Sequence, residues 1–457
     1  MRGANILIAL TFLGCDDGGG PAGAADAEVV SRPPRGGSHW TLGDAIAVGG
    51  AGLHADLAQG PDGVLGVAWF DDTPRAEGPC SEVGDPPPDK VRWTVRFAAL
   101  RGGAWTSEQV AQPILLGTPL GLSLAFEPDG APAIATMTGE PLALQRYCGA
   151  NDAGLLVRAG EEDWRLETVA TSSATAPAGD AASDFGEVVG PWSALAIGDD
   201  GDAVLAYKDV HSGAIQGDDL TRADVAVALR AGGTWTHEVI DFGRGAGDFN
   251  AVAIDAEGRA IVAWHNPVEA PSDSRRGLWV ARREADGWKT VRLYEGPSAD
   301  GPDVAVHPDT GELLVAYYVG VEGRPYLAHL AAGGDLADPH AWTLEVLGDV
   351  AYDEGYHPRI AVDPAGKVAL VWSRCARRND GLGNCDPNDD AVIFAWFDPT
   401  ADRWKTEVID AGDAARCGTF PDLAFTADGA ARVTYQCSRR SGDAFEQRLD
   451  TATRTPL

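Results

Sequence analysis

Polar side chains that could do chemistry recur at one place in a repeated unit of this sequence, where one apolar run ends or the next begins. Paired carboxylates, such as Asp56 and Asp422, are the groups that a glycosidase needs. A histidine with a tyrosine could act as base and acid in a polysaccharide lyase. The candidates for ligand binding are His54, Asp56, Asp72, Lys208, His265, Asp303, His357, Arg359, Arg374 and Asp422, and three further residues, Asp209, Asn266 and Tyr317, occupy the same kind of position.

No catalytic residue can be assigned among these candidates. The end of any closed ring of strands presents polar groups to solvent, so each residue could equally have only a structural role. The chain contains no Gly-x-Ser-x-Gly and no His-Glu-x-x-His motif. The familiar serine-hydrolase and zinc-protease arrangements therefore have no support.

Arginines are concentrated in two neighbouring repeats, although the chain as a whole has a net charge of -32. A guanidinium group binds carboxylate or sulfate through two parallel hydrogen bonds, so such a cluster could hold an acidic sugar. The alternative is that aspartates in the same loops pair with the arginines. The arginines are Arg359, Arg374, Arg377, Arg378, Arg416, Arg439 and Arg440, and the aspartates are Asp380, Asp386, Asp389, Asp390, Asp413 and Asp443.

One loop, DGLGNCDPNDD at 380–390, supplies several oxygen ligands of the kind that calcium prefers. The weak candidates are Asp380, Asp386, Asn388 and Asp390. The loop lacks the spacing of an EF-hand, and hydrated turns explain such a composition equally well. Calcium is thus possible, and no other cofactor is indicated.

A unit that occurs seven times predicts the fold. Each copy, such as AVAIDAEGRAIVAWHN at 251–266, has an apolar run, a turn with glycine and a second apolar run, which is the pattern of a hairpin. Its aligned alanines are 52 to 71 residues apart: Ala58, Ala125, Ala196, Ala253, Ala305, Ala361 and Ala424. This period predicts an all-β, seven-bladed β-propeller of four-stranded antiparallel blades.

A tryptophan that opens a polar, alternating strand is a second marker, and it also occurs seven times: Trp40, Trp105, Trp164, Trp235, Trp288, Trp342 and Trp404. Trp40 precedes the first hairpin, and no such strand follows the last one. The count balances if residues 39–46, HWTLGDAI, complete the final blade. We therefore expect the N-terminal strand to close the ring and remove an open sheet edge.

The turn before the Trp-led strand, as in EADGWKT at 284–290, lies where sialidase-type propellers carry the Asp-box. On Asp286, Gly287 and Trp288 the chain resembles BNR/Asp-box repeat proteins and exported bacterial propellers, over about residues 39–450. The resemblance implies a sialidase-like propeller fold. Sialidases usually have six blades, whereas this repeat predicts seven.

The first residues predict export. Residues 1–14 have a positive charge at Arg2 and a short apolar run, as in a signal peptide, and Gly14-Cys15 resembles the lipobox of bacterial lipoproteins. Cys15 is then the lipidated N-terminus, residues 15–37 are a flexible tether, and residues 38–457 form the propeller. We expect a lipid-anchored monomer in the cell envelope, in the outer membrane or periplasm.

Charge and cysteine content narrow the function classes further. With 36 Lys and Arg against 68 Asp and Glu, the chain is not expected to bind nucleic acid. Six further cysteines in an exported chain favour disulfides. Proximity in the repeat predicts the pairs Cys375–Cys385, Cys417–Cys437 and, by elimination, Cys80–Cys148.

The long loops of the predicted propeller share one face, where rigid strands would position a binding site. We therefore expect a surface lipoprotein that binds a glycan or a protein ligand at this loop-rich face. The alternative is a glycan-active enzyme, either a sialidase-type hydrolase or a polysaccharide lyase.

Overall fold

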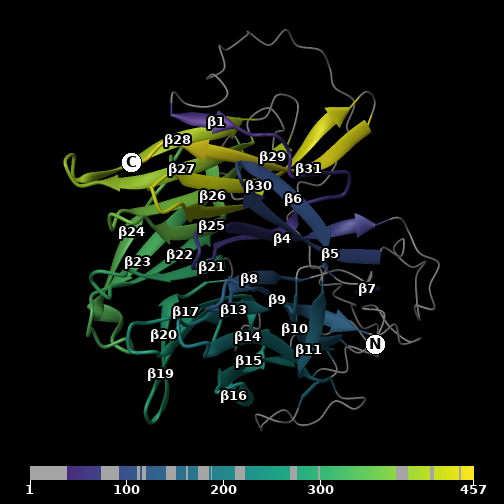
Figure 1. Cartoon of the computed structure of the whole chain (residues 1–457). Coiled ribbons are helices and arrows are strands. Elements are labelled where there is room, and N and C mark those ends of the chain that lie inside the picture. The colour runs from purple at the N-terminus through teal and green to yellow at the C-terminus, as the bar shows by residue number, and fades with distance from the viewer. Residues whose placement is uncertain are drawn as a thin grey trace, which may run out of the picture.

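A computed structural model of the chain, drawn in Figure 1, describes the chain from residue 39 onward with gaps. The described residues are 39–73, 92–110, 114–115, 120–139, 151–160, 163–172, 185–186, 188–211, 222–267, 275–296, 299–376, 390–411, 416–441 and 444–457. Within these ranges no helix is long and apolar enough to cross a membrane. The predicted signal peptide, Cys15 and the tether lie outside them.

The fold is the predicted one, a ring of seven four-stranded antiparallel blades. The strands of each blade are named from the channel outward. Blade 1 contains β3 (Leu53–Gln59), β4 (Leu65–Thr73), β5 (Arg92–Arg101) and β6 (Ala104–Gln109), and blade 2 contains β8 (Leu122–Phe126), β9 (Pro132–Gly139), β10 (Asn151–Arg158) and β11 (Trp164–Ala170). Blade 3 contains β13 (Ala194–Ile197), β14 (Ala203–Val210), β15 (Arg222–Ala231) and β16 (Thr234–Arg244).

Blades 4 to 6 follow the same order. Blade 4 contains β17 (Asp248–Ile254), β18 (Ala260–Asn266), β19 (Gly277–Glu284) and β20 (Gly287–Tyr294), and blade 5 contains β21 (Ala299–Val306), β22 (Leu313–Val319), β23 (Arg324–Leu330) and β24 (Trp342–Val346). Blade 6 contains β25 (Asp353–Val362), β26 (Val368–Ala376), β27 (Ala391–Asp398) and β28 (Arg403–Ala411). Three short additions are β7 (Ile114–Leu115), which pairs with β5, β12 (Val188–Val189), which joins blades 2 and 3, and the 3-10 helix η1 (Pro339–Ala341).

Blade 7 combines both ends of the described chain. Its strands are β29 (Arg416–Phe425), β30 (Ala431–Ser441), β31 (Ala444–Arg454) and the N-terminal β1 (Trp40–Leu42). β1 pairs antiparallel with β31, and the short β2 (Ala47–Val48) pairs with β31 further along. In Figure 1 the purple β1 accordingly lies among the yellow strands of the last blade. The prediction that residues 39–46 close the ring is confirmed.

The hairpins between the first two strands of each blade form because glycine is available at the turn. All seven of these glycines have φ between 70° and 85°, which side chains rarely adopt: Gly63, Gly130, Gly201, Gly258, Gly311, Gly366 and Gly429. An aspartate usually fixes the turn, as where Asp129 Oδ1 accepts a hydrogen bond from the Ala131 N–H at 3.0 Å.

The core lies between neighbouring blades. At one repeated position, six residues after the turn glycine, the second strands of six blades carry a large and fully buried aromatic side chain, and blade 2 has the buried Thr136 there. The aromatic residues are Trp69, Tyr207, Trp264, Tyr317, Trp372 and Tyr435. Each radial sheet is covered on both faces by its neighbours, which explains why these strands are apolar along most of their length.

On the outer wall, the Trp-led strands are joined by hydrogen bonds between blades. Trp235 Nε1 donates to Glu167 Oε1 of the preceding blade at 2.7 Å, and Trp288 Nε1 donates to Glu238 Oε2 at 2.7 Å. Trp404 bonds Glu345 in the same way, and Trp40 Nε1 bonds Glu407 Oε2 at 2.8 Å. Each acceptor lies three residues after the tryptophan of its own blade, so a Trp-x-x-Glu repeat links the outer strands of neighbouring blades by hydrogen bonds.

Candidate functional site

The loop end of the channel is ringed by one unusual backbone position in each blade, four residues before the aligned alanine. Five of these positions hold aromatic residues with φ between 48° and 56°: His54, Trp192, Phe249, His357 and Phe420. Gly121 and Gly301 occupy it in blades 2 and 5, with φ of 78° and 60°. Left-handed φ at bulky residues costs energy and is concentrated at functional sites. We call these five residues the aromatic ring.

The side chains of the aromatic ring touch one another in a closed circuit. Ring centroids are 4.4 Å apart for His54 and Phe420, 4.4 Å for Phe420 and His357, and 6.2 Å for His357 and Phe249. Phe249 and Trp192 are separated by 4.0 Å, and Trp192 and His54 by 5.5 Å. The blades thus bring together side chains that lie up to 366 residues apart in sequence, as between His54 and Phe420.

A cavity of about 50 Å³ lies within this circuit, lined by the aromatic ring, Arg359 and the residues next to the ring. This volume holds a few water molecules, since each needs about 10–15 Å³ on this measure. A sugar ring is larger. A ligand as large as a sugar ring can therefore contact the aromatic ring from the loop side but cannot pass through it.

Two residues past four of these seven backbone positions, the inner strands carry charged side chains that form a cluster: Arg359 with Asp56, Asp303 and Asp422. The Arg359 guanidinium lies 4.0 Å from Asp303 Oδ1 and 3.8 Å from Asp422 Oδ1. Solvent still reaches 30% of the Arg359 side chain, because it faces the channel. The prediction that Asp56 and Asp422 adjoin each other across the junction of blades 7 and 1 agrees with the interaction between their side chains.

The three aspartates also hold neighbouring blades together. Asp422 Oδ2 accepts the Leu57 N–H at 2.5 Å, Asp56 Oδ2 accepts the Leu124 N–H at 2.5 Å, and Asp303 Oδ2 accepts the Ile360 N–H at 2.8 Å. In every case the donor belongs to the inner strand of the next blade. These carboxylates therefore have a structural role whatever else they do.

Protonation in the cluster is shifted by burial. Burial, reinforced by the charge of Asp56, raises the pKa of Asp422 well above its ordinary value. Burial also raises the pKa of Asp303, although Arg359 opposes that shift. Burial and the nearby Arg359 charge lower the pKa of His357 to about 4, so this imidazole is neutral at physiological pH.

Other sequence candidates lie away from the aromatic ring. Lys208 is buried and its Nζ lies 2.5 Å from Asp248 Oδ1, across the interface of blades 3 and 4. His265 and Asn266 are buried at the end of β18, and Tyr317 stacks on Tyr326 inside blade 5. Asp72 lies in β4, but its side chain is outside the described part.

The described arginines of the predicted anion-binding patch are paired with carboxylates. Arg374 Nε lies 2.9 Å from the buried Glu354, and Arg439 lies 2.7 Å from Asp410. Arg359 has the aspartates given above. These partners lie on strands, whereas Asp380, Asp386, Asp389, Asp413 and Asp443 lie outside the described residues, so pairing with the loop aspartates stays a prediction. Arg377 and Arg378, and the side chains of Arg416 and Arg440, lie outside the described residues.

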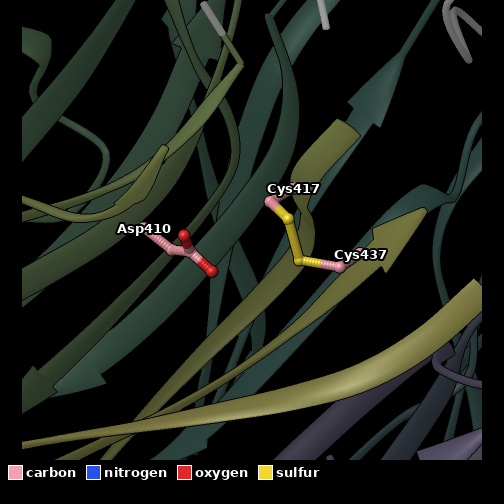
Figure 2. A group of neighbouring side chains, drawn as sticks. All are labelled: Asp410, Cys417 and Cys437. Carbon is pink, nitrogen blue, oxygen red and sulfur yellow. A yellow bond between two sulfur atoms is a disulfide. The ribbon is translucent and has the colours of Figure 1, made fainter. Parts of the chain in front are cut away.

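One predicted disulfide is confirmed, Cys417–Cys437, which joins directly opposed residues of β29 and β30. Figure 2 shows the Asp410 carboxylate pointing toward it, and Asp410 also accepts the Tyr435 hydroxyl at 3.0 Å. Because both sulfurs are in the disulfide, this group offers no thiolate for a metal. Cys375 is also disulfide-bonded. Cys80, Cys148 and Cys385 lie outside the described residues, as do the calcium candidates Asp380, Asp386 and Asn388, whereas Asp390 is buried.

Sequence reasoning found His54 and His357 but missed Trp192, Phe249 and Phe420. The signal was present, because aligning the seven repeats places an aromatic residue or glycine four positions before each alanine. The pattern was overlooked because glycine is the usual residue at a left-handed backbone position, so tryptophan and phenylalanine do not suggest one.

No protein family matches the chain in sequence, and no curated protein does. Among solved structures, a protein of unknown function from Dyadobacter fermentans is similar, with 10% identity, a TM-score of 0.48 and coverage of 92% of this chain and 98% of the other. An alpha-L-arabinofuranosidase of Fusarium graminearum has 13% identity, a TM-score of 0.47 and coverage of 79% and 99%. A sialidase of Streptococcus pneumoniae has 9% identity, a TM-score of 0.46 and coverage of 91% and 70%. These similarities concern the propeller architecture alone.

Proposed function

We propose that the loop-rich face binds an uncharged glycan on the aromatic ring. The observation that carries this proposal is the closed circuit of five aromatic side chains at the mouth of the channel. Aromatic faces stack against the C–H faces of sugars, and binding sites typically combine such surfaces with a few polar groups. Asn250 offers one, since its Oδ1 is buried without a hydrogen-bond partner among the described residues and it lines the cavity.

The charge of the channel favours an uncharged ligand over an acidic one. Three carboxylates surround the single guanidinium of Arg359 in the cluster, so the cluster repels anions even if one carboxyl is protonated. The other described arginines of the predicted patch are neutralised by Glu354 and Asp410. This argues against sialic acid or uronic acid as the ligand.

Glycine variants test the proposal without disturbing the backbone. Trp192→Gly and Phe249→Gly copy what blades 2 and 5 already carry at this position. We expect neutral oligosaccharides on a glycan array, and then in calorimetry, to bind the full chain and to bind both variants at least about tenfold more weakly. Leu344→Ala, an exposed apolar residue on the outer wall, is the matched control and should bind normally. Equal binding by all four proteins, or binding of acidic sugars alone, would contradict the proposal.

Hydrolysis of a glycan is a second candidate, supported by a different observation. Burial and the neighbouring Asp56 raise the pKa of Asp422, and a glycosidase uses a carboxylic acid whose pKa is raised as its general acid. Release of reducing sugars by the wild-type chain but not by Asp422→Asn would support this candidate. Binding without turnover would leave the chain as a binding protein only.

We propose in addition that Cys15 is lipidated and anchors the protein to a membrane of the cell envelope. The support is the sequence pattern of residues 1–15. Mass spectrometry of the mature N-terminus should find a diacylglyceryl-modified Cys15, and Cys15→Ala should release the chain into the soluble fraction. An unmodified N-terminus elsewhere would contradict this.

A further inference from the structure

Three side chains that can ligate a metal meet at the loop end of blade 3. Asp209 lies near the end of β14, His211 follows that strand directly, and Asp224 is paired with Asp209 across the ladder in β15. Residues opposed in this way point to the same face of a sheet, as do residues two apart on one strand. One ligand atom from each of the three side chains lies within 4.8 Å of the other two.

The distances within the cluster are compatible with three ligands around one metal ion. His211 Nε2 lies 3.3 Å from Asp209 Oδ2 and 3.2 Å from Asp224 Oδ2, and it has no hydrogen bond to either. The buried pair Lys208–Asp248 closes to 2.5 Å in the same region. Zinc ligands at about 2.0–2.2 Å from a tetrahedral ion are about 3.3–3.6 Å apart, whereas an octahedral ion brings them to roughly 3 Å.

The cluster is buried, and three of its polar atoms lack a hydrogen-bond partner among the described residues. His211 and Asp224 are each 1% exposed. Both ring nitrogens of His211, and Asp224 Oδ1, have no hydrogen-bond partner among the described residues. A divalent cation bound by all three side chains would give these buried polar atoms a partner, which is how buried polar and charged groups are normally accommodated.

Asp209 is held in place from outside the cluster. The Gly186 N–H donates to Asp209 Oδ1 at 2.7 Å, which leaves Oδ2 turned toward His211. A side chain at position 186 would place its Cβ 2.0 Å from the Val210 carbonyl oxygen, so only glycine permits this approach. Hydrogen bonds that orient a ligating carboxylate are a regular feature of metal sites.

We propose that Asp209, His211 and Asp224 form a structural zinc site. One imidazole with two carboxylates suits zinc, whereas calcium takes six to eight oxygen ligands. The three side chains are almost fully buried, and a water molecule would complete the four ligands of a tetrahedral ion. The ion ties β14 to β15 where their hairpin opens toward the loops. This site is independent of the aromatic ring and of any glycan.

The test uses the untagged full chain, stripped with EDTA and dialysed against zinc. We expect one tightly bound zinc ion per chain by mass spectrometry of the metal, with a higher melting temperature than the stripped chain. His211→Gln and Asp224→Asn should bind at least about tenfold more weakly. His237→Gln, a half-buried histidine of the same blade that lies outside the cluster, should bind like the wild type.

Cobalt gives a second measurement that does not depend on the variants folding. Co²⁺ in the stripped wild-type chain should show the intense visible bands of tetrahedral coordination, and added zinc should abolish them. A wild-type chain that binds no zinc, weak octahedral cobalt bands, or variants that fold and bind zinc as well as the wild type would overturn the proposal.

Discussion

The outer wall of the ring and the lining of its channel each use one repeated position per blade. The residue type at that position is constant on the wall and varies in the channel. On the wall, tryptophan opens the outer strand of all seven blades, and glutamate follows it by three residues in five of them. In the channel, the residue two positions after the left-handed one changes from blade to blade: Asp56, Ser123, Ala194, Ala251, Asp303, Arg359 and Asp422. The constant position builds the ring, and the variable one gives each part of the channel its own chemistry.

The two regions also differ in the cost of a change. The outer strands of the wall are joined by partly exposed hydrogen bonds, each of which contributes only about 1 kcal/mol to the free energy of unfolding. The channel contains few charged groups, but they are partly or almost fully buried, and an unpaired buried charge costs several kcal/mol. A single substitution should therefore be tolerated on the wall and harmful in the channel, unless the wall loses a whole strand.

Removing β1 should have the largest effect. Deletion of residues 1–46 takes away the strand that pairs with β31 and the hydrogen bond from Trp40 to Glu407. The exposed edge of β31 should then cause aggregation. Size-exclusion chromatography with light scattering and a thermal melt measure this. Deletion of residues 1–37 is the control and should leave a monomer, while a monomer with unchanged melting after the longer deletion would show that the ring does not need β1.

Replacing the channel guanidinium should have the next largest effect. Arg359→Met leaves Asp56, Asp303 and Asp422 without the cation that lies among them. We expect a loss of about 2–4 kcal/mol in the free energy of unfolding, because solvent reaches part of the guanidinium side chain and weakens these interactions. Urea denaturation at neutral pH measures it, with the exposed Arg403→Met as control. Adding Asp422→Asn should recover part of the loss. Equal effects of Arg359→Met and Arg403→Met would remove the distinction between channel and wall.

The aromatic ring should make stability depend on pH through His357. Because burial lowers the pKa of this imidazole to about 4 in the folded chain, the unfolded chain binds more protons between that value and about 6.5. The contribution of His357 is therefore complete above pH 6.5 and is lost as the pH falls toward 4, by roughly 1–3 kcal/mol. His357→Phe, which copies blades 4 and 7, should flatten this part of the profile.

Urea midpoints across the acidic range provide the measurement for His357. His340→Phe, on the exposed η1, serves as the control and should keep the wild-type slope. If the slope of His357→Phe also matched that of the wild type, the titration would have to come from other groups.

The sequence predicted the parts of the molecule that repeat. Seven hairpins and seven tryptophans gave the blade number, the closure by Trp40 and the pairing of Cys417 with Cys437, because these depend on local turns and on neighbouring strands. It did not predict contacts between blades, such as Lys208 with Asp248 or the circuit of aromatic rings. The repeat marks the positions of the aromatic residues, but their contacts depend on how neighbouring blades face each other, which the spacing along the chain does not specify.

The smallest effect on stability should come from removing one hydrogen bond between the outer strands of neighbouring blades, and a double-mutant cycle isolates its contribution. Trp235→Phe and Glu167→Ala each remove one partner of the bond between blades 3 and 2. We expect a coupling energy of about 0.5–1.5 kcal/mol from urea denaturation. The control cycle combines Trp235→Phe with Glu108→Ala, which alters a glutamate at the same repeat position in blade 1 that pairs with Arg158 instead. Its coupling should be near zero, because the two residues share no contact. Similar coupling in both cycles would mean that the wall responds as one unit and that its individual hydrogen bonds are not what separates it from the channel.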